Sequence, residues 1–121
     1  MVTNSHFQNF KSGCVNGTLS SHQVLWWFMT NQKEAFSKLK SSLYYLTRRD
    51  MEKVILLFLN FPQESICDML NITSRSWESA KHRIGLKVKA KDVTYKDGQC
   101  LYTYLQGIVY ERHNELFVIC Q

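Results

Sequence analysis

Residues 70–84, LNITSRSWESAKHRI, place hydroxyl and cationic side chains directly after a short apolar pair. Thr73 is a good helix N-cap, and backbone N–H groups at the positive end of a helix bind phosphate well. Nearby Lys and Arg side chains would add phosphate contacts that fix the register of a protein on nucleic acid. The candidate phosphate contacts are Thr73, Ser74, Arg75, Lys81 and Arg83.

The apolar residues after Thr73 recur at intervals of three and four, which predicts a helix with one buried face. Trp77, Ala80 and Ile84 form that face, so the opposite side is exposed. A second helix of this kind can enter a major groove about 12 Å wide and meet base edges there. A glutamate on the exposed side could accept a hydrogen bond from the amino group of cytosine. The candidate base contacts are Glu78, Ser79 and His82.

Positive charge is concentrated in this part of the chain. The formal net charge is +5 at pH 7, and residues 73–91 hold six Lys or Arg against the single acid Glu78. Localised charge on an otherwise near-neutral protein is expected of a phosphate-binding surface. The alternative interpretation is a solvated basic helix face, on which His82 is an ordinary exposed histidine.

Three further helices are predicted around this segment. Asn31 followed by Glu34 resembles a capping pair for a helix over 32–45. Thr47 caps a helix that runs to about Leu59, and a helix over 62–70 begins at Pro62, which is tolerated at a helix start. Residues 71–73 then form the turn of a helix-turn-helix. Gly85 is expected to weaken the helix that begins at Thr73, which gives that helix a span of about 73–84.

The flanking segments leave alternatives open. Residues 23–29, QVLWWFM, are rich in β-formers and predict a strand or a buried extended segment. Trp26 and Trp27 pack in the core or form a dimer or partner surface. Residues 86–96 fit a strand, a frayed helix end or a basic loop. A last helix is predicted over 97–107 with Asp97 near its start, and residues 109–119 fit a hairpin or a continued helix.

Composition narrows the class of protein. The 121 residues, of which 45% are apolar and 21% charged, suit one folded domain or a small domain with an arm. We expect free thiols in a reducing cytoplasm, no metal and no cofactor, because the four cysteines lack metal-ligand spacing. Neither a secretory signal nor a membrane span is predicted. No catalytic arrangement stands out, so we do not expect an enzyme. The cysteines are Cys14, Cys67, Cys100 and Cys120.

Residues 46–84 resemble the LuxR/GerE-type helix-turn-helix of bacterial response regulators and quorum-sensing activators, without a gap. The resemblance begins at Leu46-Thr47-Arg48-Arg49-Asp50 and continues through Asn71-Ile72-Thr73-Ser74 to Arg83-Ile84. It implies a tetrahelical DNA-binding domain and a dimer contact from the helix near 97–108. It also implies base contacts from Glu78, Ser79 and His82, with Arg75 and Lys81 near phosphate. The layout is similar, less closely, to TraJ-like plasmid activators.

These observations together predict a mainly α protein. Residues 1–45 would be an N-terminal arm and linker helix, a dimerisation or regulatory remnant, and residues 46–121 a helix-turn-helix domain with a C-terminal extension. The predicted function is sequence-specific binding of double-stranded DNA by a cytoplasmic bacterial transcription regulator, as a homodimer, with RNA polymerase or another regulator as a further partner. The alternative is a protein-interaction module with a divergent helix-turn-helix that pairs with another regulator.

Overall fold

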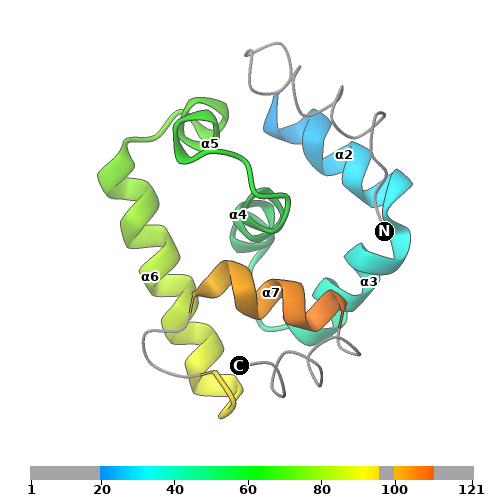
Figure 1. The fold of residues 1–121 in the computed structure, drawn as a ribbon. Helices are drawn as coiled ribbons and strands as arrows, with labels where there is room; N and C mark the ends of the chain where they lie inside the picture. The colour runs from blue at the N-terminus through cyan, green and yellow to red at the C-terminus, as the bar shows by residue number, and fades with distance from the viewer. Residues whose placement is uncertain (1–19, 96–99, 111–121) are drawn as a thin grey trace.

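The computed structural model describes residues 20–95 and 100–110, and the regular structure in these ranges is entirely helical (Figure 1). The mainly α class predicted from the sequence is therefore confirmed. The helices are α2 (Ser21–Asn31), α3 (Lys33–Ser42), α4 (Arg48–Phe58), α5 (Gln63–Leu70), α6 (Ser74–Lys91) and α7 (Leu101–Val109).

Helix α4 lies in the middle of the other helices, with α6 on one side and α2 and α3 on the other (Figure 1). Both α2 and α7 pack against α4, and α7 also packs against α3. One hydrophobic core joins Val24 and Leu39 to Ile55, Ile84 and Leu105, all almost fully buried. The division into residues 1–45 and 46–121 stays a prediction, and the described residues of both segments share this core.

Side-chain caps define where the central helices begin, as predicted. Thr47 and Asp50 form a capping box at the start of α4, in which the Asp50 N–H donates to Thr47 Oγ1 at 3.1 Å. Pro62 occupies the N-cap position of α5. Thr73 caps α6 by accepting a hydrogen bond from the Ser76 N–H at 3.1 Å. The side chains of Thr47 and Thr73 satisfy N–H groups that have no partner within the helix, whereas Pro62 makes no such hydrogen bond.

Two asparagines end the helices that precede the turns. Asn60 and Asn71 have φ angles of 60° and 55°, in the left-handed region that asparagine tolerates better than most residues. At the end of α5 the Ile72 N–H donates to the Cys67 carbonyl at 3.0 Å, which is the longer-range bond of a Schellman motif. Asn71 thus reverses the chain tightly between α5 and α6.

The N-terminal part of the described chain differs from the prediction. Residues 23–29 are neither a strand nor extended, because they lie within α2, which begins with a capping box between Ser20 and Gln23. The two tryptophans separate: Trp27 is buried, whereas Trp26 is 67% exposed. Asn31 is the last residue of α2 and does not cap α3, whose N-cap position is taken by Gln32 without a side-chain hydrogen bond.

Helix α6 continues past Gly85 to Lys91, so the predicted end of this helix near residue 84 was wrong. Val88 is completely buried, and its side chain lies on the same face of α6 as the side chain of Ile84. The strand considered for 86–96 is excluded for residues 86–91, which are helical. Helix α7 matches the helix predicted over 97–107 with shifted bounds, while Asp97 and the tail from residue 111 lie outside the described residues.

Side chains from neighbouring helices satisfy backbone carbonyls at two helix ends. Lys38 Nζ donates to the Val109 carbonyl at 3.0 Å, at the end of α7. Gln106 Nε2 donates to the Phe58 carbonyl at 3.1 Å, at the end of α4. The last carbonyls of a helix have no N–H donor within that helix, and here side chains of neighbouring helices supply the donors. These bonds tie α3, α4 and α7 together.

Candidate nucleic-acid interface

The side of α6 that faces solvent carries a row of side chains at intervals of four, three and four residues. We call Arg75, Ser79, His82 and Leu86 the outer row, and all four are exposed. Residues at these intervals share one face of a helix. The opposite face holds the buried residues Trp77, Ala80, Ile84 and Val88. Trp77 is only 2% exposed, so it anchors α6 from behind as predicted.

The start of α6 presents backbone donors together with charge. The first bond along the helix joins the Trp77 N–H to the Thr73 carbonyl at 3.0 Å, so the N–H groups of Ser74 and Arg75 precede the intrahelical ladder. Thr73, Ser74 and Arg75 are exposed. The Thr73 hydroxyl is already engaged with Ser76, because it caps the helix and also donates to Ser76 Oγ at 3.1 Å. An anion at this end would therefore meet backbone donors and the Arg75 guanidinium.

Glu78 and Lys81 interact with each other on the surface of α6. Lys81 Nζ lies 3.3 Å from Glu78 Oε2 and also lies over the Trp77 ring, 5.8 Å from its centroid. Both contacts draw the ammonium group toward its own helix. An exposed ion pair of this kind contributes little to stability, yet it reduces the charge that Lys81 offers to a phosphate.

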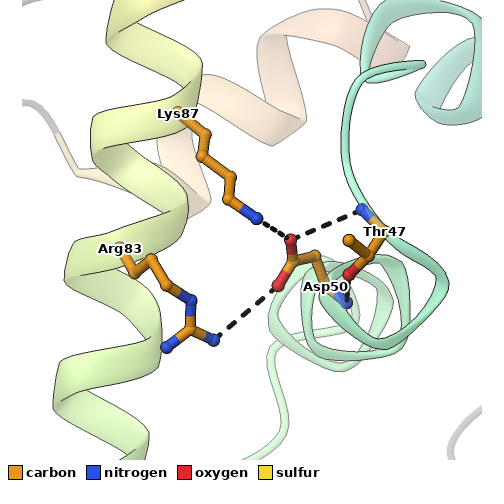
Figure 2. Close-up of polar contacts among 4 residues, drawn as sticks. All are labelled: Thr47, Asp50, Arg83 and Lys87. Atoms are coloured by element: carbon orange, nitrogen blue, oxygen red, sulfur yellow. Dashed lines mark hydrogen bonds and ion pairs between the residues drawn. The ribbon is translucent and has the colours of Figure 1, made fainter.

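Arg83 and Lys87 both reach across to Asp50 on α4 (Figure 2). Lys87 Nζ donates to Asp50 Oδ2 at 2.6 Å, and Arg83 Nη2 lies 3.8 Å from Asp50 Oδ1. The Thr47 N–H also donates to Oδ2, at 3.4 Å. Asp50 is buried, with 3% of its surface exposed, so this carboxylate needs its partners. We call Asp50, Arg83 and Lys87 the α4–α6 ion cluster.

The surroundings of Asp50 favour its ionised form. Burial by itself raises the pKa of a carboxyl, but the hydrogen bonds from Lys87 and Thr47 outweigh it and hold the pKa of Asp50 below its ordinary value. Asp50 is therefore a carboxylate at neutral pH. It fixes the orientation of α6 against α4 while neutralising part of the charge on Arg83.

The structure brings together most of the residues that the sequence singled out, and it adds others. Glu78, Ser79, His82 and Arg75 lie on the exposed side of α6, as predicted. Arg83 is also exposed, but it is paired with Asp50. Sequence reasoning missed Lys87 and Leu86. The pairing of Lys87 joins residues 37 positions apart and leaves no local signal, whereas Leu86 could have been found by extending the exposed row beyond Gly85.

Helix α7 was predicted to provide a dimer contact. Its buried residues Leu101, Leu105 and Val109 belong to the core of the same chain. A partner chain would therefore have to use the less buried side of α7, which includes Tyr102 and Thr103. The dimer contact stays a prediction.

Comparisons with protein-family models, with curated proteins and with solved structures give no match. The resemblance to the LuxR/GerE-type domain thus depends on the residues of this sequence. Within residues 20–95 and 100–110, no helix is long and apolar enough to cross a membrane. In the same ranges no three His, Cys, Asp or Glu side chains gather as metal ligands would. Cys67 and Cys100 are free thiols, and Cys14 and Cys120 lie outside the described residues.

Proposed function

We propose that this chain is a LuxR/GerE-type bacterial transcription regulator that binds double-stranded DNA sequence-specifically, with α6 as its recognition helix. The observation that carries the proposal is the two-sided character of α6. Trp77, Ala80, Ile84 and Val88 anchor one side, and the outer row stands exposed on the other. A short α5 and a tight turn precede it, which is the arrangement that a helix-turn-helix uses to lay its second helix in the major groove.

The roles of the individual residues follow from their positions. Arg75 and the N–H groups of Ser74 and Arg75 would bind phosphate at the positive end of α6. Ser79 and His82, one turn apart in the outer row, would face base edges. Glu78 would contact a cytosine amino group only after its ion pair with Lys81 loosens, so we assign it a weaker role.

Ion pairs within the chain lower the salt dependence that the cation count alone suggests. Three of the six Lys or Arg in residues 73–91 pair with carboxylates of the same chain, Arg83 and Lys87 with Asp50 and Lys81 with Glu78. Neutralisation of about three phosphates corresponds to a roughly 40-fold fall in affinity between about 50 and 200 mM salt. Six neutralised phosphates would give a much steeper loss.

The test begins with selection of bound duplexes from a random pool, using the full chain. Fluorescence anisotropy then measures the affinity for the selected duplex across the salt range. Arg75→Ala should weaken binding and reduce the slope of log affinity against log salt by about 1. Lys33→Ala is the matched control, because it removes an exposed cation from α3. If no duplex is enriched, or affinity is independent of salt, the proposed function is wrong.

A homodimer is part of the proposal, since each α6 would then occupy one half-site. Selected duplexes should show paired half-sites with centres about 10 base pairs, or a multiple of that, apart. Sedimentation of the complex gives the number of chains per duplex. A single unpaired site bound by one chain would contradict the dimer without affecting the role of α6.

A second candidate function has one specific observation in its favour. On α2, Trp26 is 67% exposed and Met29 is 42% exposed, and they lie one turn apart. A large exposed aromatic side chain is typical of protein interfaces. In this alternative the chain pairs with another regulator through α2. Trp26→Ala would then abolish partner binding while leaving duplex binding unchanged, and Arg75→Ala would do the opposite.

A further inference from the structure

A leucine occupies the outer row of α6 beside the predicted base contacts. Leu86 is 54% exposed and lies one turn beyond His82, on the side opposite the buried Ile84 and Val88. Single exposed leucines are common on proteins, so exposure alone assigns no role. Its place in the row singles it out, because Leu86 follows His82 by four residues on the side of α6 that would face the duplex.

The neighbours of Leu86 on the helix surface are polar or small. One turn before it lie His82 and Arg83, and one turn after it lie Lys89 and Ala90, all exposed. A protein groove or a lipid surface would call for several adjoining apolar side chains. A single apolar side chain between cations is instead complementary to a small apolar group on a ligand whose phosphates lie on either side of that group.

The major groove contains one such group, the C5 methyl of thymine, and apolar side chains contact it in direct readout. Leu86 follows Ser79 by seven residues, which is about 10 Å along a helix that rises 1.5 Å per residue. At 3.4 Å per base pair along the duplex, this separation is about three base pairs.

We propose that Leu86 reads thymine by packing its side chain on the C5 methyl group, about three base pairs from the pair that faces Ser79. The inference depends on the proposed function of α6 and names one feature of its target. The selected duplexes should therefore contain a fixed thymine at one position of each half-site.

The test replaces each thymine of the selected duplex in turn with deoxyuridine, which keeps base pairing and lacks only the methyl group. For the unaltered protein one such replacement should weaken binding about fourfold, the equivalent of one buried methyl group. Leu86→Ala should weaken binding to the thymine duplex by a similar factor or more. The same variant should be insensitive to deoxyuridine at that position, since the two changes remove one contact.

Val93→Ala is the matched control, because Val93 is an exposed apolar residue just beyond α6 and outside the outer row. It should respond to deoxyuridine as the unaltered protein does. Circular dichroism confirms that each variant is folded. If Leu86→Ala responds to every deoxyuridine replacement as the unaltered protein does, Leu86 does not read thymine. If duplex binding persists and still requires Arg75, that outcome leaves the proposed function standing. Absence of binding to any duplex overturns both.

Discussion

The α4–α6 ion cluster gives the sharpest prediction about stability. Asp50→Asn keeps the size of the side chain and an oxygen that can accept from the Thr47 N–H, but it removes the charge. The hydrogen bond from Lys87 to Asp50 is 2.6 Å long, and the carboxylate is 3% exposed. Hydrogen bonds to charged groups contribute about 1.5–3 kcal/mol each to stability.

The loss of unfolding free energy in Asp50→Asn should remain below the loss caused by breaking a fully buried ion pair. The side chains of Lys87 and Arg83 are 37% and 53% exposed, so both cations regain water when Asp50 loses its charge. We therefore expect Asp50→Asn to lower the free energy of unfolding by about 2 kcal/mol, less than the roughly 3–5 kcal/mol for stranding a buried charge. With an m-value of about 2 kcal/mol per molar urea, the midpoint falls by about 1 M.

Urea titration followed by tryptophan fluorescence measures this change, because Trp77 and Trp27 are buried. Lys87→Met removes the other partner, and the double variant completes a thermodynamic cycle. The two changes should be non-additive by about 1–2 kcal/mol. A coupling energy near zero would refute the role assigned to the cluster, since the two residues would then stabilise the protein independently.

Three further predictions follow from individual residues. Because the pKa of Asp50 is lowered in the folded state, the stability that its carboxylate contributes is present at neutral pH and is lost as pH falls below about 4. Below that pH the unaltered protein and Asp50→Asn should therefore differ less in unfolding free energy, which urea titrations at acid pH measure. Gly85→Ala should stabilise the protein by about 0.5–1 kcal/mol, because alanine favours a helix more than glycine does. The added Cβ has room, since it would lie 3.4 Å from the Tyr95 hydroxyl. A lower midpoint in urea titrations would contradict this. Thr73→Ala should cost about 1 kcal/mol through loss of the cap, and it should weaken duplex binding no more than Arg75→Ala does in anisotropy titrations.

Local signals predicted the central helices well. Thr47 and Thr73 mark helix starts by side-chain capping, and Pro62 marks one by its fixed backbone angle; both signals act within a few residues and are readable in sequence. Trp77 was correctly placed in the core because its spacing with Ala80 and Ile84 is helical. The exposed positions on α6 followed from the same periodicity.

The errors arose where a local capping signal was missed or where tertiary packing outweighed local preference. Aromatic residues in α2 favour strands on their own, yet the Ser20–Gln23 capping box and the burial of Val24, Trp27 and Phe28 make the segment helical. Gly85 costs a helix roughly 1 kcal/mol, and the burial of Val88 together with the Lys87–Asp50 contact offsets it. The Lys87–Asp50 contact could not be predicted from local sequence patterns, because the two residues are far apart in the chain.

The shared core has a consequence for work with shortened versions of this protein. Phe28 on α2 packs edge-on against Phe58 on α4, with ring centroids 5.7 Å apart, and Lys38 on α3 holds the end of α7. A fragment that starts at residue 46 would expose these aromatic and aliphatic surfaces to water and strip α7 of its support. Such a fragment should aggregate when it is expressed, or show less helix by circular dichroism. Excising α6 and its immediate neighbours is therefore a poor way to obtain a smaller fragment for testing the proposed DNA binding.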